Sequence, residues 1–158
     1  MIKPKDFIKE MEKHWTERLG NVSSKALRKV WYQQAEVYGY YAIGDSHRDE
    51  WTVLQPPTGS GKTQGTIVYC FMLSRLIGDL HPGVLIVTRL KADANQIAEK
   101  INELSGNMKE AVAYHSDTKD KLNITHLKKY PVLVITHRAY ELALDLLGQG
   151  GSIQQTWP

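Results

Sequence analysis

The sequence predicts an α/β fold, in which a mostly parallel sheet is flanked by helices and preceded by a helical extension. Two aliphatic, largely β-branched runs, residues 84–88 (VLIVT) and 132–136 (VLVIT), have the composition of strands buried on both faces. Helical spacing of apolar residues follows each run, and strands that alternate with helices form parallel sheets covered by helices. The length of 158 residues suits a single hydrophobic core.

The first forty residues predict two helices. Apolar residues recur at intervals of three and four over residues 4–19, and Gly20 follows the last of them. Ser23 or Ser24 provides an N-cap for a second helix that continues to about Tyr41. The apolar face of this second helix is expected to comprise Leu27, Val30, Trp31, Gln34 and Tyr38.

The remaining elements follow from the same patterns. Residues 43–50 read as a polar loop, and residues 51–55 (WTVLQ) read as a short strand that Pro56 and Pro57 end. A further short strand is expected over residues 111–114, and the last eleven residues (GQGGSIQQTWP) have no periodicity and read as a loop. Helices are expected over residues 62–77, 91–104 and 138–147.

Composition excludes several classes of protein. No apolar run approaches the roughly 18 residues that a transmembrane helix needs, and the charged N-terminus lacks the apolar segment of a secretory signal. The single cysteine forms no internal disulfide, and no Cys/His cluster has zinc spacing. We therefore expect a cytoplasmic protein with no membrane partner.

The net charge of +3 argues only weakly for a nucleic-acid partner, but its distribution is uneven. Residues 1–30 hold eight Lys/Arg and four acidic residues, which is typical of a solvated surface. Residues 121–140 hold four Lys/Arg and no acidic residue. This second cluster surrounds the end of a predicted strand, where binding groups collect in open parallel sheets.

The strongest motif is QPPTGSGKT, residues 55–63, between a predicted strand and a predicted helix. Gly59 and Gly61 permit the tight curve that points backbone N–H groups at a phosphate. The following helix adds the positive end of its dipole. Lys62 places an ammonium on the β- and γ-phosphates, and the Thr63 hydroxyl is a ligand for Mg²⁺. The pattern predicts a phosphate-binding loop for a nucleotide.

The first glycine of the general phosphate-loop pattern is replaced here by Pro56. In this form, PPTGSGKT resembles motif I of superfamily 2 helicases and related DEAD-like ATPases. The resemblance implies a RecA-like P-loop lobe that uses ATP and Mg²⁺. It also implies that nucleotide contacts come from Pro57, Thr58, Gly59, Ser60, Gly61, Lys62 and Thr63.

Two downstream segments extend the resemblance. The segment that begins VTRL at Val87 resembles motif Ia, and VLVITHRAYEL at residues 132–142 resembles motif Ib. In the family these loops grip the backbone of one nucleic-acid strand, and hydroxyl and guanidinium groups are good phosphate partners. The resemblance therefore implies phosphate contacts, to DNA or RNA, from Thr88, Arg89, Thr136, His137 and Arg138.

Upstream, LRKVWYQQ at residues 27–34 resembles the R-x-Y-Q element that precedes motif I in many members. There a glutamine reads adenine, because its amide both donates and accepts hydrogen bonds. The candidate is Gln33, which follows Tyr32. The alternative is an ordinary surface glutamine on a helix.

Motif II, an apolar strand ending in Asp-Glu, is absent after the phosphate loop, and Asp49-Glu50 precedes that loop. In the family this motif holds Mg²⁺ and polarises the attacking water. The resemblance covers roughly residues 25–147. We expect residues 1–24 to be an N-terminal helical extension and residues 25–158 to be a RecA-like lobe truncated after motif Ib, whose full-length protein includes a second RecA-like lobe.

The sequence favours the ATP-binding lobe of a nucleic-acid-dependent ATPase, with Lys62 and Thr63 in the catalytic roles. On its own this stretch is expected to bind nucleotide weakly and to hydrolyse it very slowly. Two alternatives remain open. One is a non-catalytic nucleic-acid-binding module with a vestigial phosphate loop, and the other is a different P-loop phosphotransferase.

Other notable residues are interpreted structurally. The three residues from His115 to Asp117 include catalytic-triad types, but neighbours on a strand point to opposite faces and make a poor relay. Cys70 is expected to be a core thiol, and Trp15 and Trp31 to be packing residues rather than stacking platforms for bases. Residues 1–20 match no part of the helicase core, and the sequence leaves open whether they pack or bind a partner.

Overall fold

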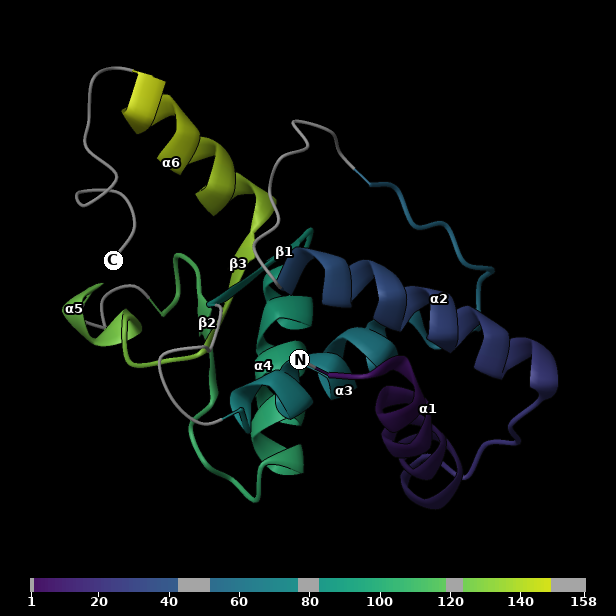
Figure 1. Ribbon diagram of the computed structural model, residues 1–158. Helices are drawn as coiled ribbons and strands as arrows, with labels where there is room; N and C mark the ends of the chain where they lie inside the picture. Colours follow the sequence, from purple (N-terminus) through teal and green to yellow (C-terminus); the bar gives the residue numbers. More distant parts are fainter. Residues whose placement is uncertain (1, 43–51, 77–82, 119–123, 149–158) are drawn as a thin grey trace. The chain divides into compact units, whose positions relative to one another are not determined.

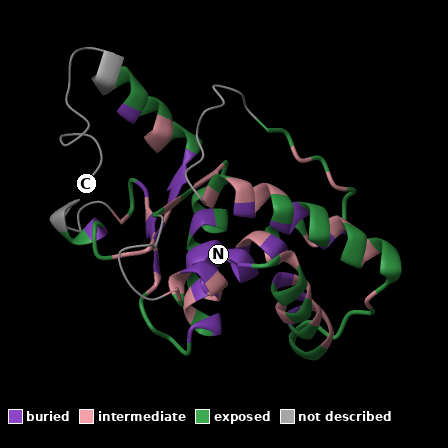
Figure 2. Ribbon diagram, viewed as in Figure 1, coloured by how far each residue is buried: buried purple, intermediate pink, exposed green. Residues whose placement is uncertain are grey.

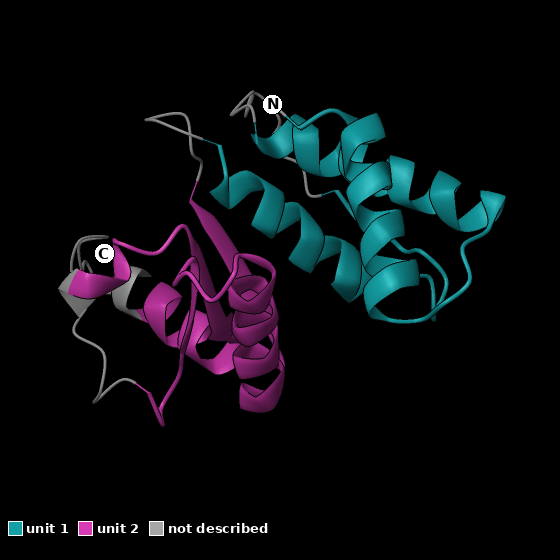
Figure 3. Ribbon diagram, turned by 90° about the horizontal axis from the view of Figure 1, so that it is seen from below, with its two compact units in different colours: residues 1–76 teal, residues 77–158 magenta. Residues whose placement is uncertain are grey.

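The structure is a computed structural model that describes residues 2–42, 52–76, 83–118 and 124–148 (Figure 1). The chain divides into two compact units, residues 1–76 and 77–158, coloured teal and magenta in Figure 3. Among the described residues, no helix is both long and apolar enough to cross a membrane.

The first unit is helical. Its elements are α1 (Pro4–Lys13), a single π-helical turn η1 (His14–Arg18), α2 (Lys25–Ala42) and α3 (Lys62–Ser74). α1 packs against both α2 and α3, and α3 is the most buried of the three, as its purple ribbon in Figure 2 shows. The predicted helices are confirmed, and the N-terminal extension is a packed part of this unit.

The ends of these helices follow the predicted signals. Gly20, just after η1, has a φ of 66°, a left-handed conformation that glycine adopts without strain. The Ser24 hydroxyl accepts a hydrogen bond from the Leu27 N–H at 3.2 Å, which is an N-cap interaction at the start of α2. Glu12 of α1 accepts hydrogen bonds from Ser23 and Arg28, and these bonds lower the pKa of its carboxyl group.

The predicted strand over residues 51–55 is wrong in its described part. Residues 52–55 have no regular secondary structure, and Val53 is 72% exposed. A strand needs a neighbour to complete its hydrogen-bond ladder, and no strand is described in the first unit. Trp51 and the predicted loop over residues 43–50 lie outside the described residues.

The second unit is an α/β layer. Its elements are β1 (Val84–Thr88), α4 (Lys91–Leu104), β2 (Ala111–Tyr114), α5 (Ile124–Leu127), β3 (Val132–Thr136) and α6 (His137–Gly148). The three strands are parallel in the order β1-β3-β2. α4 packs against all three strands, and α6 contacts β3 and β1. This confirms the predicted class, a parallel sheet flanked by helices, although the one-turn helix α5 was not predicted.

Burial of the strands depends on their place in the sheet. Central β3 is buried at Val132, Val134 and Ile135, as its composition predicted. β1 lies at one edge of the described sheet, and its Leu85 is 44% exposed, so the prediction of burial on both faces is wrong for this strand. The two runs have the same composition, so strand order rather than composition decides the difference in burial.

The other edge of the sheet, β2, is capped by a side chain. The Asn102 amide oxygen accepts hydrogen bonds from the N–H groups of Glu110 and Ala111, at 2.9 and 2.8 Å. The Asn102 amide nitrogen donates to the Ala111 carbonyl at 2.9 Å. One side chain of α4 thus pairs with the start of β2 as a neighbouring strand would, and it satisfies backbone groups that an edge strand leaves open.

Candidate nucleotide-binding loop and nucleic-acid edge

The loop before α3 turns tightly through two glycines. Gly59 and Gly61 have φ values of 80° and 81°, in the left-handed region that favours glycine. The Ser60 N–H donates to the Pro57 carbonyl at 3.2 Å, which closes a tight turn. Gly61 is the N-cap of α3, and its carbonyl accepts the first helical hydrogen bond, from Gly65 at 2.7 Å.

The first turn of α3 offers unused hydrogen-bond donors. No side chain caps the helix, so the N–H groups of residues 62–64 have no partner within it. The dipole of α3 adds partial positive charge at the same end. Lys62 and Thr63 stand exposed on this turn. The loop, the helix terminus and the ammonium together have the chemistry that an anion-binding site requires.

Side chains of the N-terminal helices support the loop. The Trp31 indole N–H of α2 donates to the Ser60 carbonyl at 2.9 Å in a buried hydrogen bond. A Cβ atom placed on Gly61 would lie 2.9 Å from Trp15 and 3.0 Å from Met11, so these side chains rest directly against the loop. Trp15 also meets Trp31 edge to face, with ring centroids 5.8 Å apart. The prediction that both tryptophans are packing residues is confirmed.

Two adjacent glutamines of α2 have different surroundings. Gln33, the predicted reader of adenine, is exposed, and its role stays a prediction. Gln34 is 1% exposed, and its amide donates to the Lys62 carbonyl at 3.0 Å and to the Tyr38 hydroxyl at 2.9 Å. Sequence reasoning missed this link to the loop, although the helical spacing that placed Gln34 beside Trp31 and Tyr38 on one face was the signal for it.

A pocket of about 260 Å³ lies beside the first residue of α3. Its walls combine aromatic rings, aliphatic side chains and the Gln34 amide, a composition suited to a planar organic ring. The lining residues are Gln34, Val37, Tyr38, Tyr41, Thr52, Leu54, Pro56 and Lys62. The pocket therefore adjoins the phosphate loop at Lys62.

The loop residues fit a nucleotide with Mg²⁺ in part. The Ser60 hydroxyl is buried and has no hydrogen-bond partner among the described residues, which leaves a polar atom of the loop unsatisfied. Thr63 presents an exposed hydroxyl at the second helical position. Within the described ranges, no cluster of three or more His, Cys, Asp and Glu residues suits a metal ion. Thr63 would thus offer Mg²⁺ one ligand, and the phosphates of a bound nucleotide would supply others.

In the second unit, the predicted nucleic-acid residues lie together at the carboxyl ends of β1 and β3. Thr88 of β1 pairs in register with Thr136 of β3, so the two strands end side by side. Arg89 and Arg138 follow these ends and are exposed, as is His137. The roles of these five residues stay predictions. Their position at the carboxyl ends of neighbouring strands places them on one surface, which a phosphate backbone could follow.

The two threonine hydroxyls also bond to the backbone. The Thr88 hydroxyl donates to the carbonyls of Leu90 and Ile135, at 3.1 and 3.3 Å. The Thr136 hydroxyl accepts from the Ala139 N–H at 3.3 Å and caps α6. Thr136 is only 9% exposed. Arg89, His137 and Arg138 are therefore more accessible to solvent than the two threonine hydroxyls.

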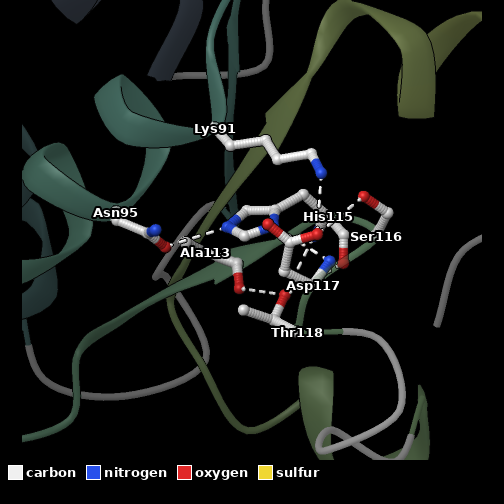
Figure 4. Close-up of polar contacts among 7 residues, drawn as sticks. All are labelled: Lys91, Asn95, Ala113, His115, Ser116, Asp117 and Thr118. Carbon is white, nitrogen blue, oxygen red and sulfur yellow. Dashed lines mark hydrogen bonds and ion pairs between the residues drawn. The ribbon is translucent and has the colours of Figure 1, made fainter.

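The loop after β2 contains triad residue types but no triad, as Figure 4 shows. His115 is buried, with Nε2 2.9 Å from the Asn95 amide oxygen and Nδ1 accepting from the Asp117 N–H at 3.3 Å. The Asp117 carboxylate pairs with Lys91 at 2.7 Å, and this ion pair lowers its pKa. Ser116 donates to Asp117 rather than to the imidazole. The cluster fastens the loop to α4.

The core thiol prediction is confirmed. Cys70 lies in α3 and is 3% exposed. Burial raises the pKa of its thiol to about 12. The thiolate, which is the reactive form, is therefore unavailable at neutral pH.

The model of the DEAD/DEAH box helicase family matches residues 34–155, which is more than half of the chain. The chain belongs to the DEAD/DEAH box helicase family. As a domain of this family, it carries a RecA-like lobe of the ATP-dependent helicase type. Comparison with curated proteins and with solved structures gave no match. The helicase match includes the phosphate loop and begins after α1, η1 and Trp31.

Proposed function

We propose that the chain is the ATP-binding N-terminal lobe of a cytoplasmic, nucleic-acid-dependent helicase-type ATPase. The full-length protein couples ATP hydrolysis to translocation on DNA or RNA or to its remodelling. One observation carries the proposal: two glycines with left-handed φ lead into an uncapped helix that begins with exposed Lys62 and Thr63. This arrangement is suited to a nucleotide's phosphates, and it lies within the matched helicase domain.

Each loop residue has a distinct task toward the nucleotide. The backbone N–H groups of Gly59 and Gly61 donate to phosphate oxygens, whereas the Ser60 N–H already donates to the Pro57 carbonyl and reaches a phosphate only if that turn opens. Pro57 and Thr58 shape the entry to the loop. The Lys62 ammonium neutralises the β- and γ-phosphates, and the Thr63 hydroxyl holds Mg²⁺. Bound Mg²⁺ supplies further neutralisation of charge on the phosphates. Gln33 remains the proposed reader of adenine.

The strand ends of the second unit supply the nucleic-acid surface. The proposed contacts to the phosphate backbone are Thr88, Arg89, Thr136, His137 and Arg138, all at the carboxyl ends of β1 and β3. Within the described residues Arg138 has one ion-pair partner, Glu141, at 3.6 Å on an exposed surface. Such a pair is weak in water, so phosphate oxygens can replace it.

Hydrolysis needs more than these residues. The sequence after the phosphate loop has no apolar strand that ends in Asp-Glu, the carboxylates that orient the attacking water in the family. We propose that these 158 residues bind Mg-ATP weakly and hydrolyse it very slowly. Activity in the full-length protein uses a second RecA-like lobe. In this proposal residues 1–24 are the helical extension and residues 25–158 are the partial lobe.

The nucleic-acid part of the proposal is tested by binding labelled single-stranded DNA and RNA at several salt concentrations. Affinity should fall as salt rises, and Arg138→Ala should reduce the slope of log K against log salt by about 0.7 for the phosphate contact that it removes. Lys5→Ala, which removes an exposed cation of α1, is the matched control and should leave the slope unchanged. An unchanged slope for Arg138→Ala would reject the carboxyl ends of β1 and β3 as the phosphate-binding surface.

A further inference from the structure

We propose that Trp31 is a positioning residue for the phosphate loop, and that Met11, His14 and Trp15 of the N-terminal segment support the same loop. The Trp31 indole holds the Ser60 carbonyl and thereby aims the Gly61 N–H at the nucleotide's phosphates. This inference rests on the proposed ATP-binding function. It also assigns a role to residues 1–33, which lie before the matched helicase domain.

Peptide geometry links the indole to the binding group. The Ser60 carbonyl and the Gly61 N–H belong to one planar trans peptide unit, so they point in opposite directions. The Trp31 indole N–H binds that carbonyl at 2.9 Å from the side of α2. The Gly61 N–H must then point away from α2. One buried hydrogen bond therefore orients a donor that the phosphate loop needs, without touching the phosphate.

The support continues along the next residues. Met11 of α1 and Trp15 of η1 rest against Gly61, where a Cβ atom would lie within 3.0 Å of each. The His14 imidazole Nε2 donates to the Gln64 side-chain oxygen at 2.9 Å. Residues 61 and 64 are thus held by side chains from the first 18 residues of the chain.

The arrangement also restrains rotation of the loop. Trp31 is 0% exposed, and the ring of Trp15 packs edge to face against it. Trp15 is fixed in turn, because its own indole N–H donates to the Val22 carbonyl at 3.2 Å. A fully buried indole that packs against Trp15 cannot follow the Ser60 carbonyl if that peptide unit flips, so the flip costs the hydrogen bond. The structure therefore favours one orientation of the Gly61 N–H before nucleotide binds.

The test compares Trp31→Phe with Phe7→Leu. Trp31→Phe keeps an aromatic ring but removes the indole donor. Phe7→Leu disturbs a fully buried contact of α1 with Tyr69 of α3 and so weakens the same core through a residue away from Ser60. We expect Trp31→Phe to weaken Mg-ATP binding roughly two- to tenfold, the effect of one lost hydrogen bond. Phe7→Leu should lower the melting temperature but leave Mg-ATP affinity unchanged at a temperature where both variants are folded.

Equal Mg-ATP affinity of Trp31→Phe and the parent chain would overturn the inference. So would an equal loss of affinity in both variants, because the effect would then be one of general stability. A second measurement needs no nucleotide: the ¹⁵N heteronuclear NOE of the Gly61 amide should fall in Trp31→Phe and stay at the parent value in Phe7→Leu.

The two measurements separate this inference from the proposed function. If the parent chain binds no Mg-ATP but the Gly61 NOE falls in Trp31→Phe, the ATP-binding function is rejected and the positioning contact stands. If the parent binds Mg-ATP and Trp31→Phe changes neither the affinity nor the NOE, ATP binding stands and the positioning role is rejected.

Discussion

Substituting the two loop glycines by alanine tests whether side chains of the N-terminal helices contact the phosphate loop. Gly59 and Gly61 have nearly the same φ, 80° and 81°, so alanine suffers the same backbone strain at either position. That strain costs roughly 1–2 kcal/mol for a residue with a Cβ atom. The two positions differ in what the new Cβ atom would meet.

At Gly59 the new Cβ atom meets nothing within 4 Å. At Gly61 it would lie 2.9 Å from Trp15 Cζ3 and 3.0 Å from Met11 Cε. Neighbours in a packed region must move to admit the extra atom, at a cost of about 1–3 kcal/mol. We therefore expect Gly59→Ala to lower the free energy of unfolding by about 1–2 kcal/mol, from the strain alone, and Gly61→Ala by that amount plus the packing cost.

The assay is urea unfolding followed by far-UV circular dichroism, with Gly20→Ala as a reference in the same unit. Gly20 has a φ of 66° and no neighbour within 4 Å, so it reports strain alone, away from the loop. The order of stability loss should be Gly61→Ala well above Gly59→Ala and Gly20→Ala. Equal losses for Gly61→Ala and Gly59→Ala would refute the contact between the N-terminal segment and the loop.

Three further predictions concern other contacts. Gly65→Ala would place a Cβ atom against the Gln34 amide oxygen and should destabilise the chain by roughly 1–3 kcal/mol. Adding Gln34→Ala should reduce that loss, and additive losses in a double-mutant cycle would contradict the contact. Cys70, with a pKa of about 12, should resist a thiol reagent at pH 9 until the chain unfolds. An unfolded thiol ionises near pH 8.5, so the free energy of unfolding should fall as pH rises above that value. Rapid modification of Cys70 in the folded chain would contradict its burial. Asn102→Ala removes three hydrogen bonds at the start of β2 and should lower the free energy of unfolding by about 1.5–4 kcal/mol. Glu99→Ala, on an exposed part of α4, is the control and should change that free energy little. Equal losses in urea unfolding would show that Asn102 does not cap the β2 edge.

Much of the second unit could be predicted from sequence, because local patterns there coincide with tertiary structure. β1, α4, β2 and β3 have the predicted bounds, since each apolar run or period has a clear beginning and end in the sequence. The β1-β3-β2 strand order has no local signal. That order exposes Leu85, which composition alone placed in the interior.

The phosphate loop was predictable because its chemistry restricts the residues at each position. Its support was not, because the contacts of Trp31 with Ser60 and of Trp15 with Gly61 join residues that lie far apart in the chain. The same limit explains why Gln34 was missed. Its helical face was predictable, but its hydrogen bond to the Lys62 carbonyl depends on how α2 and α3 pack.

The most direct test of ATP binding at this loop is calorimetric titration of the chain with Mg-ATP. Lys62→Ala serves as the test variant and Lys91→Ala, an exposed lysine of α4, as the matched control. We predict that the parent and Lys91→Ala bind with equal affinity. Lys62→Ala should bind at least tenfold more weakly, because a charge-assisted hydrogen bond contributes about 1.5–3 kcal/mol. Binding of Mg-ATP by Lys62→Ala as tightly as by the parent would contradict the proposed nucleotide site.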